Sequence, residues 1–253
     1  MYGTRDAPQN WEFEYGEFME SVGFIKGKST PCLFYHEQRN IRAVVYGVDF
    51  ILLADNKQLD WFRKRISERF EVEFKARLGG SSEDDKSVFL LNRPITWSDG
   101  QIQYEADQRH VEIICRDLGL DQHSKGVVSP FVKPTVSEIE SPGLELQGSE
   151  ATLYRAVIAR ANYLSQDRSD IRYAVKELSR AMSKPYESDM TRLKRLGRYL
   201  LKHPRLIQTM KPQAQVHYLD VWVDTDFAGC LKTRRSTNGG VITLGDHVIK
   251  HWS

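Results

Sequence analysis

The chain has 253 residues, of which 40% are hydrophobic and 28% charged, a composition typical of a globular protein rather than a disordered or fibrous one. Its 36 Lys and Arg against 34 Asp and Glu give a formal net charge of +2, which excludes a uniformly basic nucleic-acid binder. Three widely separated cysteines without Cys-x-x-Cys spacing argue against a disulfide framework or a thiolate zinc site. Without a membrane-length apolar run or a signal-peptide pattern, we expect an intracellular protein of the cytoplasm or nucleus, with no membrane contact.

The first 121 residues mix helical and strand-like patterns. Three segments carry apolar residues at helical spacing and predict helices: about 10–22, 59–70 and 111–118. Short runs of strand-forming residues predict strands: 32–35, 41–46, 49–54, 88–91, 95–97 and 102–104. Only Gly47 and Val48 separate two of these runs, which predicts a tight hairpin.

The remaining residues begin with an aperiodic stretch rich in Ser, Pro and Val, at 122–148, which predicts a linker. Three helical patterns and three strand-like runs follow in this order: 150–165, 169–183, 188–202, 221–223, 240–244 and 248–252. We therefore expect a compact helical segment followed by a small sheet.

A single carboxylate, Asp49, follows the hairpin turn. A carboxylate held on a strand is a suitable ligand for Mg²⁺, which prefers oxygen donors. The simpler alternative is that Asp49 serves only the turn.

The last of the three helical patterns is basic. Between Met190 and Lys211 there are seven Lys or Arg and no Asp or Glu. Four of these recur every three or four residues, so they are expected to share one face: Arg195, Arg198, Lys202 and Arg205. Such a stripe could neutralise successive phosphates of a nucleic acid. The alternative is a solvated face of a helix that packs through its leucines.

Two further carboxylates, Asp224 and Asp226, follow the run 221–223. Residues i and i+2 on a strand point to the same side, so these two could share a cation or a water network. Surface acids at a strand end are the alternative. The nearby basic run 232–237 could contact phosphates or form a polar loop, and no histidine pair has the spacing of a metal site.

Several motifs occur in a fixed order along the chain: 5–11 (RDAPQNW), 46–49 (YGVD), 167–171 (DRSDI), 224–230 (DTDFAGC) and 234–240 (RRSTNGG). Together they resemble the Pol polyprotein of copia-type retrotransposons over nearly the whole chain. The first two resemble its reverse-transcriptase palm, the third the segment that leads into ribonuclease H, and the last two the opening of ribonuclease H.

The resemblance implies an α+β fold in four parts. These are a partial reverse-transcriptase palm and thumb over 1–121, a linker over 122–148, a helical connection segment over 149–211 and truncated ribonuclease H-like strands over 212–253. It also implies RNA-directed DNA polymerase and ribonuclease H as ancestral activities, with Mg²⁺ as cofactor and RNA and DNA as partners. An upstream polyprotein segment would be a further partner.

The departures from the family pattern predict that the chain is inactive as it stands. The resemblance assigns Asp49 and Asp224 as catalytic metal ligands, with Asp226 as a further ligand. Val48 stands where the family carries the first Asp of Tyr-x-Asp-Asp, and an isopropyl group cannot bind a cation. The family's remaining carboxylates lie upstream of residues 5–11 and beyond the last strand, so both sites are expected to be incomplete.

Three alternatives stay open. One is a working polymerase that an upstream chain completes. The second is a non-catalytic nucleic-acid-binding module that uses the basic helix around 191–205. The third is a relic without a selected function.

Overall fold

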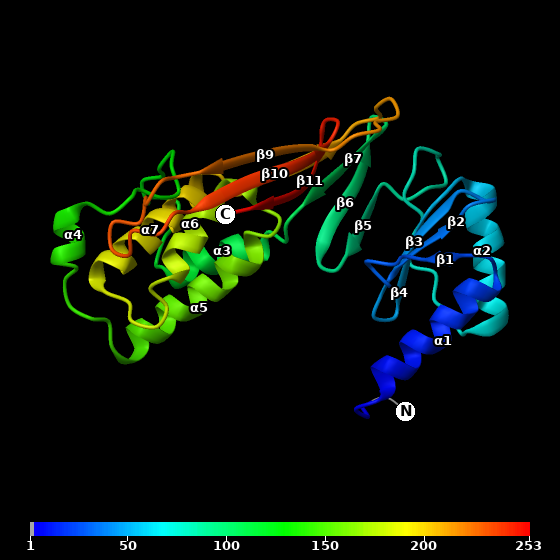
Figure 1. Cartoon of the computed structure of the whole chain (residues 1–253), viewed down its shortest axis with the longest axis horizontal. Helices are drawn as coiled ribbons and strands as arrows, with labels where there is room; N and C mark the ends of the chain where they lie inside the picture. The colour runs from blue at the N-terminus through cyan, green and yellow to red at the C-terminus, as the bar shows by residue number, and fades with distance from the viewer. Residues whose placement is uncertain (1–2) are drawn as a thin grey trace. The chain divides into compact units, whose positions relative to one another are not determined.

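The computed structural model describes residues 3–253, so residues 1–2 of the first expected segment lie outside the described part of the chain. The described residues group into two compact units, one up to Lys75 and the other from Ala76 to Ser253 (Figure 1). Both units combine helices with antiparallel sheets, so the α+β class predicted from the sequence is confirmed. No helix within residues 3–253 combines the length and the apolar character that a membrane span needs.

The first unit packs two helices on a four-stranded antiparallel sheet of order β1-β2-β3-β4. Its elements are α1 (Ala7–Ser21), β1 (Ile25–Lys26), β2 (Leu33–His36), β3 (Ile41–Tyr46), β4 (Asp49–Leu53) and α2 (Asn56–Arg69). Strand β3 buries Ile41, Ala43 and Val45 at every second position. These side chains share a core with Met19 of α1 and Phe62 of α2, because a period of two puts one face of the strand toward the helices.

The hairpin of β3 and β4 forms where the sequence predicts it. Gly47 has a φ of +59°, the left-handed conformation that primed hairpin turns require and that glycine adopts without strain. Tyr46 and Asp49 are cross-strand partners beside the turn. The indole Nε1 of Trp11 donates a hydrogen bond of 2.7 Å to the Gly47 carbonyl, so the start of α1 is fixed to the hairpin tip.

The second unit contains two antiparallel sheets, of order β5-β6-β7-β8 and β11-β10-β9. Its strands are β5 (Ser87–Leu90), β6 (Arg93–Ser98), β7 (Gln101–Glu105), β8 (Ile207–Met210), β9 (Asp220–Thr225), β10 (Asn238–Leu244) and β11 (His247–Trp252). The predicted strands are thus present, and β8 is an additional one. It pairs with β7 although the helices of this unit lie between them in sequence.

The helices of the second unit are α3 (Arg109–Asp117), α4 (Val136–Glu140), α5 (Gly148–Leu164), the 3₁₀ turn η1 (Ser169–Ile171), α6 (Arg172–Ser179) and α7 (Glu187–Lys202). Four of them share one core, with Ile114 of α3, Ile158 of α5, Val175 of α6 and Leu196 of α7 fully buried. Helix α3 therefore packs with helices that the sequence analysis assigns to a later segment.

The segment 122–148, expected to be a linker, is packed onto the helices of its own unit. It contains α4, which begins with a capping box between Thr135 and Glu138. Leu146 is buried, and its backbone N–H donates a hydrogen bond of 2.9 Å to the Pro185 carbonyl. The segment is therefore ordered by the short helix α4 and by tertiary contacts such as those of Leu146.

Candidate functional sites

The hairpin tip of the first unit holds one carboxylate, engaged by a lysine. Lys75 Nζ lies 2.6 Å from Asp49 Oδ1, and this hydrogen bond raises the pKa of the Lys75 ammonium group. Val48 beside it is 64% exposed and offers only methyl groups. Among residues 3–253, no three His, Cys, Asp or Glu side chains gather where they could hold a metal ion. The donor set at this hairpin therefore does not fit a pair of Mg²⁺ ions.

The carboxylates Asp224 and Asp226 lie in different environments. Asp224 is exposed on β9 opposite Gly239, whereas Asp226 lies one residue beyond the end of that strand. The Thr237 N–H donates a hydrogen bond of 2.6 Å to Asp226 Oδ1, and the same bond lowers the pKa of the Asp226 carboxyl. Asp226 therefore closes the loop between β9 and β10, whereas Asp224 is exposed on β9.

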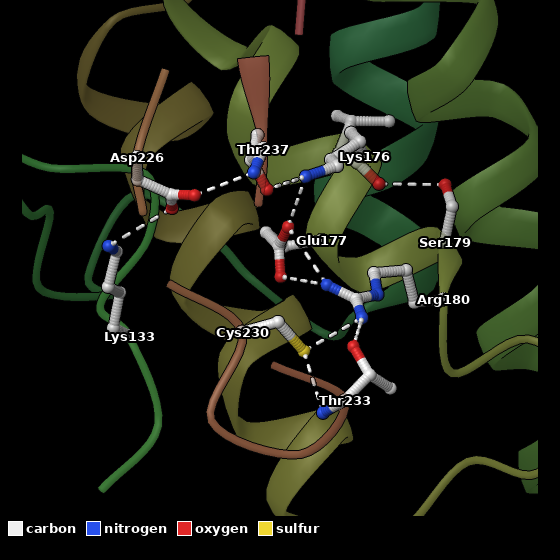
Figure 2. A network of polar contacts seen from close by, with 10 residues as sticks. Lys133, Lys176, Glu177, Ser179, Arg180, Asp226, Cys230, Thr233 and Thr237 are labelled. Atoms are coloured by element: carbon white, nitrogen blue, oxygen red, sulfur yellow. Dashed lines mark hydrogen bonds and ion pairs between the residues drawn. The ribbon is translucent and has the colours of Figure 1, made fainter. Parts of the chain in front are cut away.

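That loop is bound to helix α6 through a polar network (Figure 2). Lys176 Nζ donates to Thr237 Oγ1 at 2.8 Å, and Arg180 Nη2 lies 2.9 Å from Cys230 Sγ. Burial opposes ionisation of this thiol, but hydrogen bonds from Thr233 and Arg180 prevail and lower the pKa of Cys230 to about 7. Sequence reasoning missed this pair, because Arg180 and Cys230 lie 50 residues apart without a motif that links them.

The basic helix α7 packs through leucines, and its basic side chains contact the segment 122–135. Leu193, Leu196 and Leu200 are fully buried. Arg195 Nε donates a hydrogen bond of 3.1 Å to the Ser129 carbonyl, and Arg198 Nε one of 2.6 Å to the Lys125 carbonyl. Two of the four predicted nucleic-acid-binding side chains therefore already donate to neutral backbone acceptors.

Of the other two, Lys202 is the exposed last residue of α7, and Arg205 lies beyond the helix, after Pro204. The Arg205 guanidinium binds both carboxylate oxygens of Glu105 on β7, at 2.6 and 2.9 Å. This pairing lowers the pKa of Glu105. Arg205 is therefore not part of the helical face on which the sequence places it, because α7 ends at Lys202.

A cavity of about 790 Å³ opens in the first unit, a feature that no sequence pattern indicates. Its lining includes His36, Arg39 and Trp61, with the Arg39 guanidinium stacked 3.9 Å from the Trp61 ring centroid. His36 is only 6% exposed, and its Nδ1 has no hydrogen-bond partner. Burial lowers the pKa of this imidazole, with the Arg39 charge as a second cause.

Comparisons with known proteins match the chain over its whole length. It is 28% identical to each of two proteins of Arabidopsis thaliana, the retrovirus-related Pol polyproteins from transposons RE1 and RE2, which it covers to 16% of their length. The retrovirus-related Pol polyprotein from transposon TNT 1-94 of Nicotiana tabacum is 22% identical over 98% of the chain and 18% of that protein. No family model matches the chain. No solved structure matches it either.

The chain is therefore a homologue of retrovirus-related Pol polyproteins of transposons. These relatives are of the copia type, so the resemblance derived from the sequence motifs is confirmed. The chain spans about one sixth of the length of the curated relatives that it matches.

Proposed function

We propose that the chain is the region of a copia-type Pol polyprotein that runs from the reverse-transcriptase palm and thumb through a helical connection into ribonuclease H. We further propose that this 253-residue polypeptide alone carries neither polymerase nor ribonuclease H activity. The observation that supports inactivity best is the hairpin tip, where Val48 replaces one expected carboxylate and Lys75 engages the other, Asp49.

Polymerisation in this family needs two metal ions held by converging carboxylates, which activate the attacking hydroxyl and stabilise the leaving group. Asp49 offers one carboxylate, and an ammonium group 2.6 Å away competes with any cation for it. Coulomb attraction between unit charges at such a distance favours the ion pair of Lys75 with Asp49. A metal ion would displace the lysine only if further ligands also held that metal ion. Among the described residues, no three His, Cys, Asp or Glu side chains gather where they could complete such a site.

Primer extension on an RNA template, with Mg²⁺ or Mn²⁺, tests the inactivity directly. The matched control is Asp49→Asn, which keeps the shape of the hairpin and removes its charge. We expect the chain and the variant to incorporate equally little nucleotide. Incorporation by the chain well above that of the variant would show that Asp49 belongs to a functioning site.

A second function, nucleic-acid binding through α7, is favoured by the charge environment of that helix. Arg195, Arg198 and Lys202 have no carboxylate within ion-pair distance in the described part of the chain, and their neighbour Lys194 is exposed. Positive side chains without paired acids can neutralise phosphates and release counterions. Fluorescence anisotropy with a labelled DNA duplex tests this function, and binding that does not weaken with salt would contradict it.

A further inference from the structure

The segment 122–135, called the strap from here on, runs antiparallel to α7. Its Lys125 carbonyl accepts from Arg198 and its Ser129 carbonyl accepts from Arg195, so the order along the strap is opposite to the order along the helix. Beyond the strap, Glu138 of α4 continues the run, with its Oε1 4.0 Å from Arg192 Nη1. The strap therefore lies over the same face of α7 on which the sequence predicts a phosphate-binding stripe.

A close approach at Gly126 lets the strap lie along the end of α7. A Cβ built on Gly126 would stand 2.8 Å from Lys202 Cβ, closer than side-chain atoms tolerate. Because the obstacle is the stem of Lys202 rather than its flexible tip, a larger residue at 126 must displace the strap. Gly126 has no positive φ, so a side chain there causes no backbone strain and acts only through this contact.

The strap is held by few and weak interactions. It forms no helix or strand and pairs with no strand. Besides the two arginine hydrogen bonds, the strap has two anchors. One is Phe131, whose ring meets Tyr173 edge-on at 5.7 Å and packs against the helical core. The other is a long ion pair of the exposed Lys133, with its Nζ 4.0 Å from Asp226 Oδ2. Val128 and Val132 are 76% and 52% exposed, so they contribute little burial. Segments with so few buried contacts open locally at a small free-energy cost.

The acceptors that the strap offers are also weaker than phosphates. A carbonyl oxygen is neutral, whereas a phosphate oxygen carries charge and makes shorter, stronger hydrogen bonds with a guanidinium. A polyanion can therefore compete with the Lys125 and Ser129 carbonyls for Arg198 and Arg195. Because the same two guanidinium groups would donate either to the strap carbonyls or to phosphate oxygens, binding of the strap and binding of a polyanion exclude one another.

We propose that the strap is an autoinhibitory cover of the basic face of α7. With the strap closed, Arg195 and Arg198 donate to its carbonyls; with the strap open, they are free to bind the phosphates of a nucleic acid. The inference rests on the proposed nucleic-acid-binding function of α7 and adds its regulation. By linkage, opening the strap strengthens binding, and binding opens the strap.

The test compares Gly126→Leu, which pushes against Lys202, with Val128→Leu, which enlarges an exposed residue of the same strap. Two measurements are made on the full chain: anisotropy of a labelled DNA duplex, and the rate of chymotryptic cleavage after Phe131. Cleavage there reports strap opening, because the Phe131 ring is packed against Tyr173 when the strap is closed. We expect Gly126→Leu to bind the duplex about tenfold more tightly, equivalent to about 1.4 kcal/mol, and to be cleaved faster. Val128→Leu should match the wild type in both, and added duplex should speed cleavage of the wild type.

The outcomes separate the cover from the binding function. If Gly126→Leu is cleaved faster but binds no more tightly than a wild type that does bind, the cover is wrong and nucleic-acid binding stands. If neither protein binds the duplex even at low salt, both proposals fail. Should Gly126→Leu not fold, as judged by circular dichroism, Phe131→Ala opens the strap from its other end. Tryptic cleavage after Lys125 then reports the opening, and the same binding result decides.

Discussion

Arg168 and Asp170 form a bidentate ion pair inside the second unit, with Nε to Oδ1 at 2.9 Å and Nη2 to Oδ2 at 2.7 Å. The same guanidinium, only 1% exposed, donates to the His203 and Pro204 carbonyls at 2.8 and 2.9 Å. Those carbonyls follow α7, whose last backbone acceptors have no partner within the helix. One buried arginine therefore joins the turn η1 to the end of the basic helix.

Arg168→Met should be strongly destabilising, because it leaves Asp170 charged and unpaired and removes the donors to both carbonyls. Breaking a buried pair on one side costs about 3–5 kcal/mol. Urea unfolding followed by circular dichroism measures the loss. The matched control is Arg116→Gln, since Arg116 is 72% exposed beside Asp117 and its loss should cost less than about 1 kcal/mol. Equal stability of the two variants would show that the Arg168 network contributes nothing.

The sequence predicts the elements that depend on local signals, but not the contacts between residues far apart in the chain. Helical periodicity and turn glycines are local signals, so α1, α2, the hairpin at Gly47 and the strands β9 to β11 follow from the sequence. Strand β8 is four residues long and gains its partner β7 only through the tertiary fold, about 100 residues away, so no local pattern indicates it.

The candidate site residues divide in the same way. The sequence correctly gives Arg195 and Arg198 one helical face, but it cannot indicate that carbonyls 66 and 73 residues away accept from them. Likewise, the ion pair of Asp49 with Lys75 depends on how the chain returns after α2, which periodicity does not encode.

Val48→Asp alone should not restore polymerase activity. The new carboxylate would stand beside Asp49, but Lys75 would still compete for Asp49, and the described residues contain no group of three His, Cys, Asp or Glu that could hold a metal ion. Val48→Asp combined with Lys75→Gln removes that competitor and should also stay inactive in primer extension. Nucleotide incorporation by the single variant would mean that the polymerase site has been misplaced.

Cleavage of an RNA–DNA hybrid by the 253-residue chain should be undetectable in Mg²⁺ or Mn²⁺. Hydrolysis by two metals requires several converging carboxylates, whereas Asp226 accepts from the Thr237 N–H and Asp224 stands exposed on β9. A gel assay with a labelled hybrid measures it, and Asp224→Asn is the control for contaminating nucleases. Activity that disappears in this variant would overturn the expectation.

Acid should destabilise the first unit through His36. The pKa of the folded imidazole is lowered by burial and by Arg39, so the unfolded chain takes up a proton first as the pH falls through about 6.5. Stability is therefore present above this range and is lost below it. His36→Phe, which fits the edge-on packing with Phe24 and Trp61, should reduce the loss of melting temperature between pH 7 and pH 5. The control His217→Gln, at an exposed position, should leave this loss of melting temperature unchanged. An equal loss in the two variants would exclude His36 as its cause.

Binding of a DNA duplex should depend on Arg195 and Arg198 through charge. With Arg205 paired to Glu105, about three contacts remain on α7, so the logarithm of affinity should fall with the logarithm of salt concentration with a slope of roughly −3. Replacing both arginines with Gln should reduce that slope by about two units for every duplex sequence alike, because phosphate contacts carry no base information. Lys57→Gln with Lys64→Gln removes the same charge from exposed positions of α2 and serves as the control. If the two double variants change the slope equally, the effect comes from net charge and not from α7. If the arginine variant unfolds while the wild type shows no salt-sensitive binding, Arg195 and Arg198 serve only to hold the strap.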